Sequence, residues 1–303
     1  MARRKKSHIA SPRYWPAWLG LFLLWLSAKG LSYTQAIWLG RRIGRLGYRF
    51  ARRRRHIAQV NLSLCFPDLS VLSLDSRVRE HFESLGIGLV ITGFAWWASD
   101  KKLQPLVSIE GLEYLEDSLS QGRGALLLGC HFTDLEIFGR LLIQFTAIGV
   151  MYRRHENPVI ERALTRNRER SFTAVIPRDD IRQLVRTLRK NQAVWYAPDQ
   201  SFKGSNSTLA PFFGVPAATN TGTSRLAKIA KAPVHPFIAY RLPGDRGYKL
   251  IIKPPLEDFP SDDLDADASR INRLIEEEIA YAPEQYFWIH RRFKKRKGLP
   301  DPY

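Results

Sequence analysis

The sequence predicts an α/β fold in which a mixed, largely parallel sheet is flanked by helices and preceded by an N-terminal membrane helix. The first observation is that short apolar runs alternate with amphipathic stretches from residue 124 onward. The second is a run of 15 uncharged residues, rich in tryptophan and leucine, between Arg13 and Lys29. We therefore expect a membrane anchor with a basic interfacial helix over residues 1–55 and an α/β domain over residues 56–303.

The uncharged run near the N-terminus has three possible roles: a signal peptide, a membrane span or an anchor in the membrane interface. No small-x-small cleavage site is followed by an ordinary mature start, which argues against a signal peptide. As a helix the run is roughly 22 Å long, short of the bilayer's apolar thickness of about 30 Å. A second uncharged run, over residues 30–40, could extend it past a snorkelling Lys29. We favour a single span over an interfacial anchor, followed by a basic interfacial helix over residues 41–55.

The net charge of +18 is concentrated at the two ends of the chain. Residues 1–60 hold 14 Lys and Arg and no acid, residues 291–297 hold six Lys and Arg, and residues 61–290 hold 27 basic and 28 acidic residues. A nucleic-acid-binding domain would carry its charge on the folded middle, so no nucleic-acid partner is expected. The distribution suits the anionic cytoplasmic surface of a membrane. Cys65 and Cys130 match no metal or redox spacing, which indicates free thiols in a reducing compartment.

The order of elements supports the α/β prediction. Residues 56–122 are expected to be helical, with the helical spacing of apolar residues over 78–97 broken by glycines. Beyond them, apolar runs predict strands, and amphipathic runs with a polar cap nearby predict helices. The expected strands are Ala125–Cys130, Ala193–Ala197, Val234–Tyr240 and Lys249–Ile252, and the expected helices are Asp180–Lys190, Thr221–Ala230 and Ala268–Tyr281. In such a sheet, sites form where the carboxyl ends of strands meet helix N-termini.

A histidine follows the first of these strands. His131 comes directly after Ala125–Cys130, and a helix is expected to begin near Thr133. On a continuous helix His131 and Glu136 would lie about 140° apart, but a histidine placed before the helix lets the carboxylate fold back to the imidazole. Such a pair suits general-base catalysis. The structural alternative is a capping box from Thr133 to Glu136. Asp134 is a rival carboxylate, expected to be a solvated acid of the first helical turn.

Two further polar groups are candidates for binding substrate. Arg153 precedes Asn157 by four residues, and its guanidinium could hold an anionic head group or a phosphate through a forked contact. The alternative is a solvated loop with an Asn-Pro turn. Asp199 follows the strand Ala193–Ala197, where an acid beside aromatic residues would suit a site for an apolar chain with a polar end. The alternative there is a loop after a buried strand. No nucleotide-binding loop, HExxH motif or cysteine array for zinc is present, so no metal site is expected.

Several segments together resemble the lipid A late acyltransferases, the lauroyl and myristoyl type that act on Kdo2-lipid IV-A. The similarity runs nearly end to end and includes RYWPAWLGLFLLWL, NLSLCFPDLS, GCHFTDLE, YRRHENP, VWYAPDQSF, PFFGVPAATNTGT and APEQYFWIHRRFKKR. The family's His-x4-Asp/Glu pair falls on His131 and Glu136, its Arg-x-x-x-Asn element on Arg153 and Asn157, and its Tyr-Ala-Pro-Asp element on residues 196–199. Arg154 stands where proline is frequent, and residues 200–202 depart from the usual sequence, which leaves the acyl chain length open.

The resemblance implies a glycerolipid-acyltransferase-like α/β fold, an N-terminal membrane segment and no metal or nucleotide cofactor. It implies an enzyme at the inner membrane, with its catalytic domain on the cytoplasmic face. The donor would be an acyl–acyl carrier protein and the acceptor a 3-hydroxyacyl hydroxyl of Kdo2-lipid IV-A, with His131 as general base supported by Glu136. The alternatives are an acyltransferase for another membrane lipid hydroxyl and a non-catalytic basic membrane-binding protein.

Overall fold

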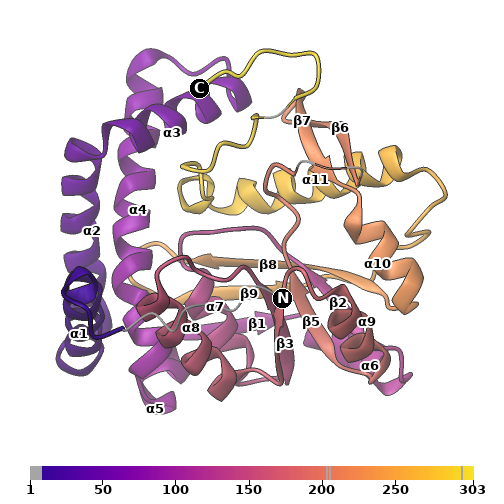
Figure 1. Ribbon diagram of the computed structural model, residues 1–303, viewed down its shortest axis with the longest axis horizontal. Coiled ribbons are helices and arrows are strands. Elements are labelled where there is room, and N and C mark those ends of the chain that lie inside the picture. Colours follow the sequence, from indigo (N-terminus) through magenta and orange to yellow (C-terminus); the bar gives the residue numbers. More distant parts are fainter. Residues whose placement is uncertain (1–8, 203, 205, 295) are drawn as a thin grey trace.

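The computed structural model describes residues 9–202, 204, 206–294 and 296–303, and its main sheet confirms the predicted fold class. The strands are β1 (Val107–Glu110), β2 (Ala125–Leu128), β3 (Ile148–Tyr152), β4 (Ala174–Pro177), β5 (Ala193–Tyr196), β6 (Ser207–Phe212), β7 (Val215–Asn220), β8 (Val234–Arg241) and β9 (Tyr248–Ile252). Seven of them form one sheet in the order β1-β9-β8-β2-β5-β3-β4 (Figure 1). Every neighbouring pair in this sheet is parallel except β8 and β9. β6 and β7 form a separate antiparallel hairpin.

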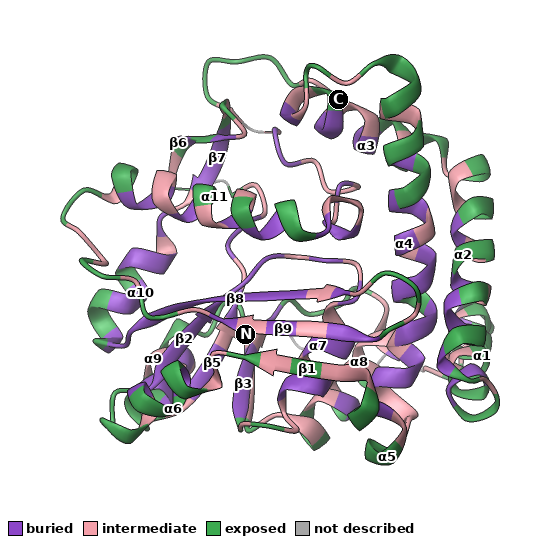
Figure 2. Ribbon diagram, turned by 180° about the vertical axis from the view of Figure 1, so that it is seen from behind, coloured by how far each residue is buried: buried purple, intermediate pink, exposed green. Residues whose placement is uncertain are grey.

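The described helices lie on both faces of the sheet, and the first three pack mainly against the fourth rather than against a strand. They are α1 (Trp15–Gly30), α2 (Tyr33–Phe50), α3 (Arg52–Cys65), α4 (Val71–Trp97), α5 (Asp100–Leu103), α6 (Leu112–Ser120), α7 (Leu135–Leu142), α8 (Pro158–Ser171), α9 (Ile181–Arg189), α10 (Gly222–Ala230) and α11 (Leu264–Tyr281). α11 lies over one face of β8, and α7 lies over the other. Figure 2 shows the buried residues concentrated on the strands and on the helix faces turned toward them.

The central strand β2 is buried on both faces. All four of its residues are at most 2% exposed, which fits the continuous apolar run expected of a parallel strand covered on both sides. β5 and β8 flank it, with Leu128 opposite Tyr196 on one side and Pro236 on the other. Loops that leave the carboxyl ends of β2 and β5 therefore start side by side.

Glycines let the N-terminal helices approach α4 closely. A Cβ atom on Gly86 of α4 would lie 2.2 Å from the carbonyl oxygen of Gly40 and 2.4 Å from the amide nitrogen of Gly44, both on α2. A Cβ atom on Gly88 would lie 2.2 Å from the carbonyl oxygen of Thr133. Because such distances exclude any side chain, the glycines that interrupt the apolar spacing of α4 are contact points between backbones. Through Gly88, α4 reaches the loop that follows β2.

The expected N-terminal membrane helix is not supported. Among the described residues, no helix has the length and apolarity needed to cross a membrane. The two uncharged runs form separate helices, since α1 ends at Gly30 and α2 begins at Tyr33. Ser32 stops the first run from continuing into the second: its hydroxyl accepts a hydrogen bond from the backbone N–H of Gln35, whose side chain accepts one from the Ser32 N–H. The first eight residues of the expected anchor lie outside the described residues.

The stretch over residues 56–122 is mainly helical, with one exception. β1 occupies Val107–Glu110 at the edge of the sheet, where it pairs with β9. Its residues alternate between half-buried and exposed, so this short strand carries little of the apolar signal on which the prediction rested. The division of the chain at residue 55 stays a prediction, and α3 runs across it.

Candidate active site

The loop after β2 is held by the C-terminal part of the chain. The backbone N–H of Phe287 donates to the carbonyl oxygen of His131 at 2.9 Å, and the N–H of Thr133 donates to the carbonyl oxygen of Gln285 at 2.8 Å. Between these two bonds, Phe132 forms an isolated bridge with Tyr286. The segment that follows α11 therefore fixes the backbone on which His131 sits.

His131 is paired with Asp199. Its Nδ1–H donates to Oδ1 of Asp199 at 2.5 Å, and its backbone N–H donates to Oδ2 of the same carboxylate at 3.1 Å. The pair forms because β2 and β5 are neighbouring parallel strands, so the residues after their carboxyl ends meet. The side chain of Asp199 is 1% exposed, whereas that of His131 is 29% exposed. The imidazole is therefore anchored from behind and accessible in front.

The two partners shift each other's pKa in opposite directions. Burial alone lowers the pKa of His131, but the charge of Asp199 and the hydrogen bond to it raise that pKa by more, so the net shift is upward. Burial raises the pKa of Asp199, while the charge of His131 and its two hydrogen bonds lower it by more. With Nδ1 engaged by the carboxylate, Nε2 is the ring nitrogen left to accept a proton. Such an arrangement suits general-base catalysis, with the carboxylate orienting the imidazole.

Glu136 does not make the contact that the sequence analysis expected. Its carboxylate accepts a hydrogen bond from Trp96 Nε1 at 2.9 Å and forms an ion pair with Arg168 of α8, and no hydrogen bond joins it to His131 among the described residues. The carboxylate at the imidazole is that of Asp199. The structural alternative, a capping box from Thr133 to Glu136, is also absent, because α7 begins at Leu135 and no side chain caps it. The catalytic role assigned to Glu136 stays a prediction.

Asp134 is buried, whereas the sequence predicted that it is exposed to solvent. It was predicted to be a solvated acid, and that prediction was wrong: Asp134 is 2% exposed and forms an ion pair with Arg241, itself 9% exposed. Arg241 also donates to the Ser84 hydroxyl of α4 at 3.0 Å. The physical reason is that the closely packed α4 covers the start of α7, so an acid there must be paired to be buried.

Arg153 and Asn157 form their hydrogen bonds and ion pairs with residues other than His131 and Asp199. The side chain of Arg153 is 64% exposed and forms an ion pair with Glu156 at 3.4 Å. The Asn157 side-chain oxygen accepts from the N–H groups of Val159 at 2.9 Å and Ile160 at 3.5 Å, so it caps α8. Their proposed part in binding substrate is therefore not supported by a contact with His131 or Asp199 in the described part of the chain.

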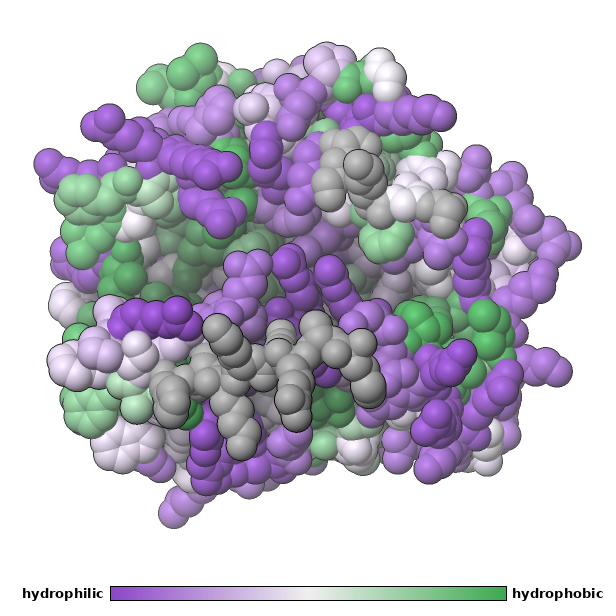
Figure 3. Space-filling view, viewed as in Figure 1, coloured by the Kyte–Doolittle hydropathy of each residue, from purple (hydrophilic) through white to green (hydrophobic). Residues whose placement is uncertain are grey.

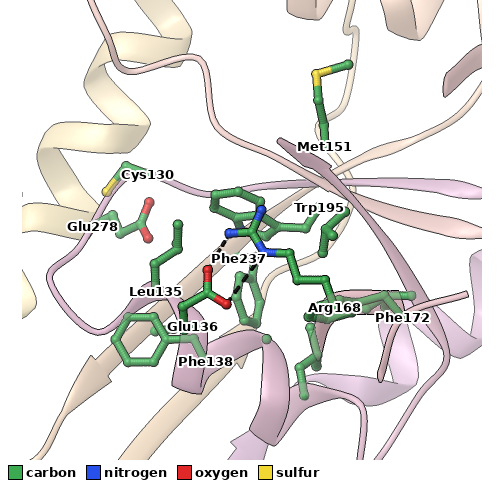
Figure 4. A pocket seen from close by; sticks show the side chains of 15 residues that line it. Cys130, Leu135, Glu136, Phe138, Met151, Arg168, Phe172, Trp195, Phe237 and Glu278 are labelled. Carbon is green, nitrogen blue, oxygen red and sulfur yellow. Dashed lines mark hydrogen bonds and ion pairs between the residues drawn. The ribbon is translucent and has the colours of Figure 1, made fainter. Parts of the chain in front are cut away.

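A largely apolar pocket adjoins the loop that carries His131. Its apolar and aromatic walls include Leu135, Phe138, Met151, Phe172, Trp195 and Phe237, and the Glu136–Arg168 ion pair lies among them (Figure 4). The centroid of the Trp195 ring lies 6.2 Å from that of the His131 ring, so the imidazole lies beside a residue that lines the pocket. Arg168 could not be recognised from the sequence, because one arginine in the basic segment that becomes α8 has no distinguishing local pattern.

The chain is similar over nearly its whole length to known lipid A enzymes. The sequence pattern of a family described as bacterial lipid A biosynthesis acyltransferase matches residues 2–295. The chain is 41% identical over 295 residues to the lipid A biosynthesis lauroyltransferase of Escherichia coli K12, covering 96% of each chain. It is 42% identical over 286 residues to the palmitoleoyltransferase of that organism, covering 94% of this chain and 93% of the other. It is 28% identical to the myristoyltransferase, covering 96% and 91%.

Proposed function

This chain belongs to the bacterial lipid A biosynthesis acyltransferase family, and on that premise we propose that it transfers a fatty acyl chain from an acyl carrier protein thioester to a 3-hydroxyacyl hydroxyl of Kdo2-lipid IV-A. The chain is thus an O-acyltransferase. The observation that carries the finer proposal is the His131–Asp199 pair beside an apolar pocket. A general base next to a wall of apolar side chains suits a reaction between a hydroxyl and a fatty acyl thioester.

The proposed reaction is a direct acyl transfer. His131 Nε2 accepts the proton of the acceptor hydroxyl as its oxygen attacks the thioester carbonyl carbon. The carbon–sulfur bond breaks, the new ester remains on the lipid, and the imidazolium returns its proton to the departing thiolate. Asp199 holds the imidazole in the tautomer that carries its proton on Nδ1 and stabilises the imidazolium. The supporting role that the sequence analysis gave to Glu136 passes to Asp199 in this proposal.

We assign to Arg168 the role of stabilising the negative charge that develops on the thioester oxygen. Its guanidinium lies in the pocket, held there by Glu136, and its charge lowers the pKa of His131, which places it within electrostatic reach of the imidazole. Glu136 then serves the reaction by holding Arg168, and Trp96 fixes the carboxylate from the side of α4. Donors positioned in advance stabilise such charge without reorganising during the reaction.

We propose that α1 and α2 attach the enzyme to the cytoplasmic surface of the inner membrane. α1 exposes large apolar side chains, among them Trp15, Trp18, Leu19, Phe22, Leu23 and Leu26. α2 exposes Trp38, Leu46 and Phe50 among arginines. Figure 3 shows hydrophobic residues along the edge where α1 and α2 lie, next to strongly hydrophilic ones. This combination is typical of helices that lie in the interface of an anionic bilayer, the alternative that the sequence analysis ranked second.

Mass spectrometry of the lipid product tests the proposed reaction. Purified protein in detergent is given Kdo2-lipid IV-A and a panel of acyl carrier protein thioesters of different chain length. We expect one added acyl mass, and His131→Ala is expected to reduce the rate at least about 10²-fold. A folded His131→Ala variant with normal turnover would contradict the assigned base. No added mass with any donor would favour another lipid hydroxyl, which competition between head groups would then identify.

A further inference from the structure

Arg241, the last residue of β8, holds the loop after β2 through its side chain. Its guanidinium forms an ion pair with one carboxylate oxygen of Asp134 and donates to the Ser84 hydroxyl of α4 at 3.0 Å. The Ser84 hydroxyl lies 2.8 Å from that of Thr133, which donates to the other Asp134 oxygen at 3.2 Å. These four side chains therefore close a ring of hydrogen bonds that joins β8, α4 and the loop.

The order of donors around this ring follows from the protons available. Thr133 has one hydroxyl proton and gives it to Asp134, so the proton between the Ser84 and Thr133 hydroxyls belongs to Ser84. Ser84 in turn accepts from Arg241, and both oxygens of Asp134 are used as acceptors. Ser84, Asp134 and Arg241 are all buried. A buried ring whose members are all hydrogen-bonded is rigid, so it specifies one arrangement of the loop.

The backbone of Arg241 reaches the same loop through a second set of hydrogen bonds. The side-chain oxygen of Gln285 accepts from the Arg241 N–H at 2.8 Å, and the side-chain nitrogen of Gln285 donates to the Arg241 carbonyl oxygen at 3.0 Å. The carbonyl oxygen of Gln285 accepts the N–H of Thr133 at 2.8 Å. Arg241 thus holds Thr133 along two routes, through Ser84 at the hydroxyl and through Gln285 at the N–H.

We propose that Arg241 is a positioning residue for His131. This inference rests on the proposed function, in which His131 is the base whose placement matters. Only Phe132 separates Thr133 from His131, so a shift of Thr133 would move the imidazole relative to Asp199. Small displacements of a catalytic group reduce turnover strongly even when substrate binding is intact.

Stability alone does not account for a buried ion pair at this place. Apolar residues of similar volume often replace such a pair without loss of stability, because removing two charges from water offsets much of their attraction. A stabilising role and a positioning role therefore differ in what they predict for the same variant. Replacing a stabilising pair would lower Tm and leave kcat of the folded protein intact, whereas replacing a positioning pair would lower kcat while Tm is retained.

The test replaces both members of the pair at once, as Asp134→Leu with Arg241→Met, so that neither charge is left buried without a partner. We expect kcat to fall about tenfold, with KM for both substrates within about twofold of the parent value. The matched control is Glu110→Leu with Lys249→Met, which removes the ion pair between β1 and β9 at the edge of the sheet and should leave kcat unchanged. Thr133→Val keeps the ion pair but opens the ring at one hydroxyl, so we expect kcat to fall about threefold.

Proton NMR of the His131 Nδ1–H, assigned by its absence in His131→Asn, gives a second readout that does not depend on turnover. We expect this signal, which reports the hydrogen bond to Asp199, to shift in the double variant and to stay in place in the control. Normal kcat or an unchanged signal in the folded double variant would overturn the proposal. If the double variant does not fold, Thr133→Val carries the test, and normal kcat in that variant would overturn the proposal as well. Absence of turnover in the parent enzyme would refute the proposed function, while the proton signal would still test Arg241.

Discussion

Oδ1 of Asp199 lies 2.5 Å from Nδ1 of His131, although 68 residues separate the two in sequence. The same carboxylate accepts the backbone N–H of His131 through its other oxygen at 3.1 Å. Asp199 therefore fixes both the imidazole ring and the backbone of His131. A partner that binds both groups leaves the imidazole few orientations, and it raises the basicity of the ring at the same time.

The first prediction concerns the pH dependence of the reaction. His131 accepts a proton only when it is neutral, and Asp199 raises its pKa above the usual value of 6.5. We therefore expect kcat/KM to fall as the pH decreases through that raised pKa, with the acid limb of the profile above pH 6.5. Asp199→Asn removes the charge that raises the pKa, so burial should then lower it and move the limb to lower pH.

The plateau rate of Asp199→Asn should also fall, by about 10²- to 10⁴-fold, because the amide no longer fixes the productive tautomer. Rate profiles and NMR titration of the imidazole measure the two effects separately. The control is Asn220→Asp at the end of β7, which exchanges the same two residue types away from the imidazole. An acid limb that stays in place in Asp199→Asn would show that another group sets the pH dependence.

The second prediction separates the roles of Glu136 and Arg168. Because Glu136 is bonded to Arg168 and Trp96 rather than to the imidazole, Glu136→Gln should leave the pKa of His131 nearly unchanged. Arg168→Met should lower kcat about 10²-fold, since it removes the positive charge assigned to the thioester oxygen. The double variant should lose little more than Arg168→Met alone, because the two residues act as one unit. Additive losses in steady-state kinetics would mean that Glu136 acts independently of Arg168.

Sequence and structure agree best where the signal is local. The apolar runs that became β2, β5 and β8 could be recognised because strands buried on both faces are almost continuously apolar. β9 alternates between buried and half-buried residues, but it was recognised from the apolar run at its end. The expected strands did not include β3, β4 and the β6–β7 hairpin; β6 and β7 contain exposed residues and a proline each. His131 was found for the same reason as β2, since it follows that strand directly.

The partner of His131 could not be found in this way. The predicted partner was a carboxylate five residues along the chain, whereas the actual contact depends on β5 lying beside β2 in the sheet. Strand order is a tertiary property that local pattern does not encode. The same limit explains Arg168, which reaches the pocket from α8. Asp199 was singled out only as a residue for binding substrate, from its place after a strand.

The third prediction concerns the donor. The exposed residues Arg162, Arg166 and Arg170 recur at intervals of four along α8, so they lie on one face of this helix. The same helix carries Arg168, which lines the pocket. An acidic acyl carrier protein bound there would bring its thioester close to the site. Replacing Arg162 and Arg166 with glutamate should raise KM for the carrier thioester about tenfold or more, with kcat changed less than about twofold.

The effect of these charge reversals should weaken as salt is added, because exposed charges are screened. Arg273→Glu, an exposed reversal on α11, is the matched control and should leave KM unchanged. Equal effects of the α8 and α11 reversals would point to a general influence of net charge rather than a docking surface.

The fourth prediction concerns attachment to the membrane through α1. Leu19, Phe22 and Leu23 are 53–59% exposed, and burying side chains of this size in a bilayer interface contributes roughly 1–2 kcal/mol each. Replacing all three with serine should weaken cosedimentation with anionic vesicles at least about 10²-fold, while turnover of detergent-dispersed lipid stays near the parent rate. Val71→Ser with Leu72→Ser, on the exposed start of α4, removes comparable apolar surface away from α1 and should bind as the parent does. If the α1 variant sediments with vesicles as strongly as the parent, attachment depends on the arginines of α2 and α3, and vesicles without anionic lipid should then release both proteins.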